Sequence, residues 1–297
     1  MEAMTSSETL RDLADRYWEA RLEASPLFAT FLGDHRYDDR VDDLSAEADA
    51  RRRTVWQAFA DEARSIDPDG LDATDRVTRQ LLIEELDEAT ASIDARFIEL
   101  ASDQMQGIHA ELLTMAGQLR AAEPGHAAMA VRRVRAMGTM LDQAADRYRA
   151  GLAAGRTPAK TCIERSINQI DGYLGSPLEQ DPFVQLAGPD EWDGEAAWRA
   201  ELGEAVLTDL RPSFERYRRV LADELAPVAR PDEQPGLCWL EEGEDLYRQL
   251  IRLHTGLELT PEELHEIGLR EATQELPAQY RELGARAFGT DDLGQIF

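Results

Sequence analysis

Hydrophobic residues recur along most of the chain at the three-to-four-residue spacing of amphipathic helices. Leu10, Leu13 and Tyr17 begin this pattern, and residues so spaced share one face of a helix. Thr5 and Glu8 have the spacing of a capping box, so we expect a helix to begin there. No run of strand length alternates β-branched with polar residues, and no repeat of fixed period is found. The sequence therefore predicts an all-α fold of long antiparallel helices.

Turn and capping residues divide this pattern into separate helices. Ser25-Pro26 ends the first helix because proline disfavours the helical conformation in the residue before it. Thr157-Pro158 is expected to supply the N-cap and first residue of another helix. Pro212 is expected to kink its helix, and Pro277 to kink or end its own. The further helices are expected at 27–32, 45–66, 74–93, 102–120, 126–151, 157–174, 195–224 and 243–254, and from Thr260 onwards.

The domain organisation is interpreted as one helical N-terminal portion of a larger protein, covering residues 1–297. The longest irregular stretch, 175–194, offers a subdivision into 1–175 and 195–297 as the alternative. A new helix begins between Asp291 and Phe297, where the sequence stops, so we expect the chain to be truncated.

Charge and composition restrict the partners. The chain has 59 acidic and 32 basic residues, a net charge of −27, which repels nucleic acid and anionic membranes. No stretch approaches the roughly 18 apolar residues of a membrane span, and the polar first residues lack the apolar core of a signal peptide. Cys162 and Cys238 are interpreted as reduced thiols. We therefore expect a cytoplasmic protein without nucleic-acid or membrane partners; the sequence leaves its oligomeric state open.

The five histidines do not form a zinc-peptidase motif. Such a motif places two histidines four residues apart on one helix, with a glutamate that activates water. His265-Glu266 is the only His-Glu pair, and Leu269 stands where the second histidine is needed. The sequence therefore assigns no catalytic and no metal-binding residue.

Two clusters are candidates for contacts with a charged ligand. The first lies between Gly33 and Arg40 and offers Asp34, His35 and Arg36; its alternative interpretation is a salt-bridged structural loop. The second offers Tyr247 and His254 at helical spacing; its alternative is a buried histidine with satisfied hydrogen bonds.

Three segments resemble a bacterial family known as domain of unknown function 885 (DUF885). They are SPLFATFLGDHRYDDRVDDLS (25–45), TPAKTCIERSINQIDGYLGSPLEQDPFV (157–184) and GLCWLEEGEDLYRQLIRLHTGLELTPEELHEIGLRE (236–271). The segments follow the order found in the family and together span most of the chain.

The resemblance implies a protein about twice this length, similar in architecture to helical zinc metallopeptidases of the gluzincin type. Its metal motif, His-Glu-x-x-Pro-Gly-His-His, belongs to the C-terminal half. Aligning that motif on Pro124-Gly125-His126 puts Arg120 and Ala121 in place of His-Glu, so no family ligand transfers to this chain.

The family therefore implies zinc and a peptide substrate for the longer parent protein, and this chain would be inactive alone. The long helices of this chain would then form one wall of a deep cleft, and the candidates for that wall or for substrate contacts are Asp34, His35, Arg36, Tyr247 and His254. The alternative function is a non-catalytic helical module that binds a peptide or a protein.

Overall fold

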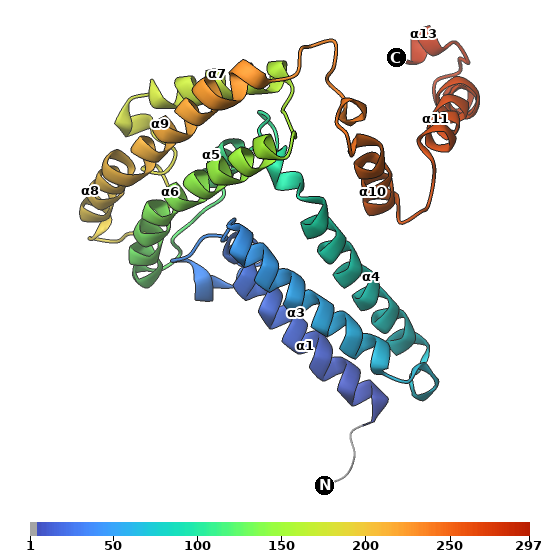
Figure 1. Cartoon of the computed structure of the whole chain (residues 1–297), viewed down its shortest axis with the longest axis horizontal. Coiled ribbons are helices and arrows are strands. Elements are labelled where there is room, and N and C mark those ends of the chain that lie inside the picture. Colours follow the sequence, from blue (N-terminus) through green and yellow to red (C-terminus); the bar gives the residue numbers. More distant parts are fainter. Residues whose placement is uncertain (1–4) are drawn as a thin grey trace. The chain divides into compact units, whose positions relative to one another are not determined.

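The computed structural model describes residues 5–297, and every regular element in that range is helical (Figure 1). Isolated backbone bridges join Arg120 with Ala187 and Ala159 with Arg230. The all-α prediction is confirmed. The α-helices are α1 (Ser6–Ala24), α2 (Pro26–Phe31), α3 (Ala46–Ser65), α4 (Ala73–Ala95), α5 (Ile108–Ala116), α6 (Pro124–Ala153), α7 (Lys160–Leu174), α8 (Glu195–Ala205), α9 (Arg211–Arg219), α10 (Gly243–Thr255), α11 (Pro261–Arg270), α12 (Leu276–Ala287) and α13 (Leu293–Ile296).

Capping residues fix several helix starts where the sequence predicts them. Thr5 accepts a hydrogen bond from the backbone of Glu8 at 3.3 Å, and the Glu8 carboxylate accepts one from the backbone of Thr5 at 2.9 Å. Thr260 and Glu263 form the same reciprocal pair at the start of α11. Ser45 caps α3. These bonds satisfy backbone N–H groups that have no partner inside the helix.

Two predicted helix starts are wrong, and both have a local reason. Asp103 accepts hydrogen bonds from the backbones of Met105 and Gln106 at 2.7 and 3.0 Å, so this stretch forms a turn and α5 begins only at Ile108. The carbonyl of Pro158 accepts a hydrogen bond from the backbone of Arg230 at 2.8 Å. That bridge keeps Thr157-Pro158 outside the helix, and α7 begins at Lys160.

The expected helix at 195–224 is interrupted by wider turns. α8 passes into a π-helical turn at Val206–Leu210, and a second one, Val220–Leu225, follows α9. Pro212 lies in the first turn of α9, directly after the first π-helical turn. Pro277 likewise follows a π-helical turn, Glu271–Glu275. Proline lacks the N–H group that a continuous helix needs, and the π-helical turn absorbs that break.

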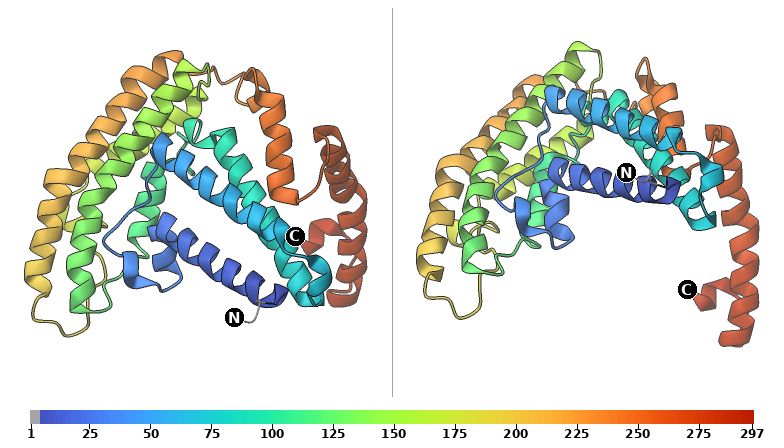
Figure 2. Two further views of the ribbon diagram at one scale, coloured as in Figure 1. Left: turned by 60° about the horizontal axis from the view of Figure 1, so that its bottom comes forward. Right: turned by 90° about the horizontal axis from the view of Figure 1, so that it is seen from below.

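The chain divides into two compact units, of which the first ends at Gly236 and the second is Leu237–Phe297. The first unit holds two hydrophobic cores: α1, α3 and α4 enclose one, and α5 to α9 enclose the other. Both views in Figure 2 show these two groups of helices. The irregular stretch 175–194 lies within the first unit, where Phe183 and Leu186 are buried in the second core.

The second unit buries little of its apolar surface. Leu246 and Ile251 of α10 are buried, whereas Leu269, Leu283 and Phe288 on the later helices are exposed. Gly256 ends α10 with a positive φ of 67°, which glycine adopts without steric cost. None of the described helices is long and apolar enough to cross a membrane.

Helix α6 is the central element of the larger core, and a glycine lets α9 approach it. A Cβ atom at Gly138 would collide with the Ser213 side chain. We expect Gly138→Val to lower the free energy of unfolding by about 1–3 kcal/mol through overpacking. The control is Gly172→Val in α7, where nothing lies within 4 Å of the added Cβ atom. Urea unfolding checks both variants; equal stability of the two would contradict this packing.

Candidate functional site

The loop between α2 and α3 begins with an ion-paired turn. Gly33 has a positive φ of 85°, and the Asp34 carboxylate then accepts a hydrogen bond from the backbone of Arg36 at 3.1 Å, which caps the 3₁₀ turn His35–Tyr37. The Arg36 guanidinium binds Asp34 and also Glu19 of α1, at 2.7 Å. Hydrogen bonds from Arg36 lower the pKa of Asp34. The structure thus gives Asp34 and Arg36 partners within the protein, as in the structural-loop interpretation.

A buried ion pair fastens this loop to α6. Arg133 is 3% exposed and Asp38 is 5% exposed. The guanidinium donates hydrogen bonds to the carbonyl oxygens of Arg40 at 2.9 Å and Tyr37 at 2.8 Å, and to Asp38 Oδ1 at 3.3 Å. Thr30 of α2 also donates to Asp38 Oδ1, at 2.6 Å. These bonds fix the position of the Asp38 carboxylate.

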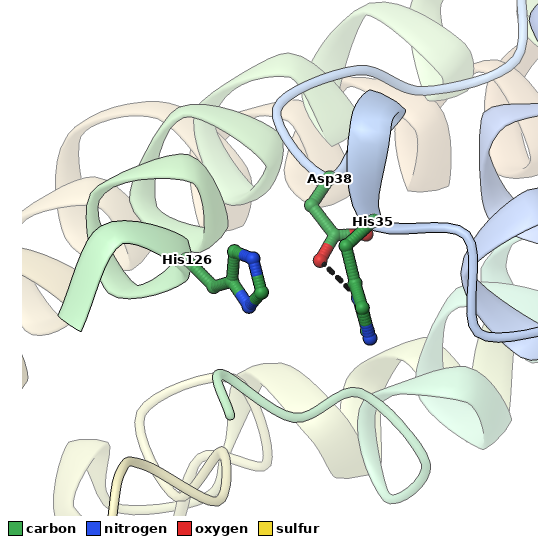
Figure 3. Close-up of side chains that lie close together, drawn as sticks. All are labelled: His35, Asp38 and His126. Atoms are coloured by element: carbon green, nitrogen blue, oxygen red, sulfur yellow. Dashed lines mark hydrogen bonds and ion pairs between the residues drawn. The ribbon is translucent and has the colours of Figure 1, made fainter. Parts of the chain in front are cut away.

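His35, Asp38 and His126 lie together at this junction (Figure 3). His35 Nδ1 is 2.8 Å from Asp38 Oδ2, and the rings of His35 and His126 stack with centroids 4.7 Å apart. One potential ligand atom from each side chain lies within 4.8 Å of the other two. Within residues 5–297 this is the one cluster of three or more His, Cys, Asp or Glu side chains arranged closely enough to share a metal ion.

Local sequence explains how each member of the cluster is positioned. His35 and Asp38 are three residues apart and belong to the same turn. His126 stands in the first turn of α6, which Pro124 begins with a φ suited to a helix start. A small cavity of about 10 Å³ beside the cluster is lined by Thr30, Asp38, His126 and Arg133, among others, and has room for roughly one water-sized particle.

The sequence candidates on α10 are exposed. Tyr247 is 44% exposed and His254 is also exposed, whereas Ile251 between them is buried. The interpretation of His254 as a buried histidine is therefore wrong. Tyr247 and His254 belong to the second compact unit. Asp34, His35 and Arg36 belong to the first.

His109 lies in the larger core and is fully buried. Its Nε2 lies 3.1 Å from the Gln169 side-chain oxygen, and its Nδ1 lies 3.4 Å from the hydroxyl of Tyr217. The Tyr217 hydroxyl is in turn 3.0 Å from that of Tyr148. Burial lowers the pKa of His109 to about 4, so the imidazole is neutral at pH 7.

Sequence reasoning missed the cluster because it treated the histidines separately. In the register of a linear zinc motif, His126 follows Arg120 and Ala121 where the motif needs His-Glu, so it attracts no attention there. The short spacing of His35 and Asp38 was a usable local signal. Their meeting with His126 depends on the long-range contact between the loop and α6, which no local pattern encodes.

Comparison with known proteins gives one family match and a likeness of fold. The sequence model of a family described as "Bacterial protein of unknown function (DUF885)" matches residues 26–297. Among solved structures, the one described as "the putative lipoprotein from Colwellia psychrerythraea" has a TM-score of 0.82 and 16% sequence identity. The match covers 98% of this chain and 52% of that one, so the chain spans about half the length of that structural relative. A search of curated proteins finds no match.

Proposed function

This chain belongs to the bacterial DUF885 family, and we propose that it forms the N-terminal helical part of a zinc-dependent peptide hydrolase. In this proposal the chain binds and orients the peptide, and the catalytic zinc belongs to the C-terminal half of the longer protein. Zinc bound there would polarise the scissile carbonyl and lower the pKa of a bound water molecule. The resemblance to helical zinc peptidases supports the proposed peptide hydrolysis. The surface of this chain supports its proposed role in binding the peptide.

A hollow between the end of α2 and α5 is the observation that carries the proposal. It has a volume of about 460 Å³, and its lining combines apolar with polar side chains. Phe31 is 50% exposed and Met105 is 79% exposed, so large apolar surfaces face solvent there. Gln106, Thr114 and Gln118 add hydrogen-bonding groups. Ligand sites commonly combine an apolar lining with a few polar groups in a hollow of this size.

Methionine suits a site that accepts different peptides. Its unbranched, polarisable side chain adapts to irregular partners, and Met105 and Met115 both line the hollow. Met115 is buried beneath the surface while Met105 projects from it. The hollow is therefore suited to apolar peptide side chains of more than one shape.

The proposal predicts a binding defect without a chemical defect. In a protein that joins this chain to the zinc-motif half of the family, we expect Phe31→Ala combined with Met105→Ala to raise KM for a fluorogenic peptide about five- to tenfold, with kcat retained. That loss corresponds to about 1 kcal/mol of apolar burial by the substrate. Leu207→Ala is the control, because Leu207 is 52% exposed and does not line the hollow.

Three results would contradict the proposal. The first is zinc-dependent peptide turnover by the 297-residue chain alone. The second is an unchanged KM in the Phe31/Met105 variant. The third is a complete, correctly folded protein that binds peptides but does not hydrolyse them; that result would favour the alternative, a non-catalytic peptide-binding module, which the same hollow supports.

A further inference from the structure

We propose that His35, Asp38 and His126 bind one divalent transition-metal ion such as zinc. This ion would join the loop after α2 to the start of α6. The inference does not depend on the proposed peptidase function, because every ligand belongs to this chain. It rests on the donor set, its geometry, the atoms that hold it in place and the local charge.

The donor set matches the chemistry of such ions. Two imidazoles and one carboxylate are the protein ligands of many zinc sites that keep one position for water, and of other first-row metal sites. Calcium and magnesium prefer all-oxygen surroundings, which this cluster does not provide. The chemistry therefore selects zinc and its neighbours in the first transition row.

The geometry requires only a small movement. Ligand atoms around a tetrahedral zinc ion at about 2.0–2.1 Å lie roughly 3.4 Å apart. The potential ligand atoms here lie within 4.8 Å of one another. The widest pair must therefore close by at most about 1.4 Å, which is within the reach of side-chain rotation for His35 and His126, both partly exposed.

Hydrogen bonds fix the orientation of the Asp38 carboxylate, as a metal ligand requires. Thr30 and Arg133 both donate hydrogen bonds to Oδ1, whereas Oδ2 is directed to the His35 ring. Hydrogen bonds to the second oxygen orient a ligating carboxylate and are a regular part of metal sites. In Figure 3 the His126 side chain extends from the start of α6 towards Asp38 and His35.

An unsatisfied atom points to the same conclusion. His126 Nδ1 is buried and has no hydrogen-bond partner. Buried polar atoms without a partner are uncommon and indicate a missing ligand, ion or water molecule. The adjacent cavity of about 10 Å³ is lined by His126 and Asp38 and is large enough for roughly one such particle.

The local charge permits a cation despite the presence of Arg133. Asp38, Asp39 and Asp42 all act electrostatically on that guanidinium, and Arg120 also lines the cavity. Asp39 is also paired with Arg132, at 3.5 Å. The whole chain carries a net charge of −27. The Asp38 carboxylate between the two histidines and the negative charge of the whole chain both favour a bound cation.

Zinc titration of the chelator-treated, tag-free 297-residue chain tests the inference. Calorimetry is expected to give one zinc ion per chain, and His35→Ala and His126→Ala are each expected to weaken binding at least tenfold. Zinc is also expected to raise the melting temperature of the wild-type chain but not of the two variants, since a ligand that binds only the folded state stabilises it. His254→Ala is the matched control, because His254 is an exposed histidine outside the cluster.

Circular dichroism first verifies that the variants are folded. The inference is wrong if the wild-type chain binds no zinc, or if a folded His35→Ala, His126→Ala double variant binds it as tightly as the wild type. Weaker binding in His254→Ala alone would also contradict it. No peptide is present in this titration. The zinc result can therefore be interpreted even if the peptidase proposal proves wrong.

Discussion

Arg133→Ala is expected to lower the free energy of unfolding by about 3–5 kcal/mol. The substitution leaves the Asp38 carboxylate, 5% exposed, without its charged partner. It also removes the hydrogen bonds to the carbonyl oxygens of Tyr37 and Arg40. Removal of one member of a buried, hydrogen-bonded ion pair typically costs this much because the remaining charge stays in a poorly solvated position.

Arg132→Ala is the matched control for this measurement. Arg132 is the neighbouring residue on α6, but its side chain is 56% exposed and its ion pair with Asp39 spans 3.5 Å. Exposed ion pairs contribute about 0–1 kcal/mol, so its loss should be small. Urea unfolding of the two variants gives the comparison. Similar losses in both would show that Arg133 does not hold the loop.

His109 is expected to make the folded state less stable as the pH falls below about 6.5. Its pKa is about 4 in the folded protein and 6.5 in the reference state. Between these values the unfolded chain binds more protons than the folded chain, so acid favours unfolding. The contribution is fully present above pH 6.5 and is lost as the pH falls towards 4. From pH 7.5 to pH 5 the expected loss is about 2 kcal/mol.

His109→Gln removes this titration and keeps a polar side chain. The free energy of unfolding of this variant should therefore depend less on pH than that of the wild type, by about 2 kcal/mol between pH 7.5 and 5. His254→Gln, an exposed histidine, should retain the wild-type dependence. Parallel pH profiles for His109→Gln and the wild type would contradict a buried, neutral His109.

The sequence predicts well those features that depend on neighbouring residues. The capping boxes at Thr5 and Thr260 fix helix starts through bonds that span three residues. Prediction from the sequence fails where a residue distant in the chain determines the local structure. Pro158 remains outside α7 because its carbonyl accepts a hydrogen bond from Arg230, a contact that belongs to the tertiary fold.

The same distinction applies to the candidate site. The acidic and basic residues of the 34–40 loop could be identified as a cluster, and the ion pair between Asp34 and Arg36 follows from their spacing. The role of Arg133 could not be identified, because an arginine on an amphipathic helix is ordinarily exposed. His126 joins His35 and Asp38 only because Arg133 draws the loop onto α6.

We propose that Arg133 fastens the loop to α6 and so assembles a metal site from His35, Asp38 and His126. Crystallographic diffraction from zinc-soaked crystals at the zinc absorption edge tests it most directly. We expect an anomalous peak within bonding distance of all three side chains, at about 2.0–2.2 Å from each ligand atom. Well-ordered side chains with no peak between them, at a zinc concentration that occupies other sites, would contradict it.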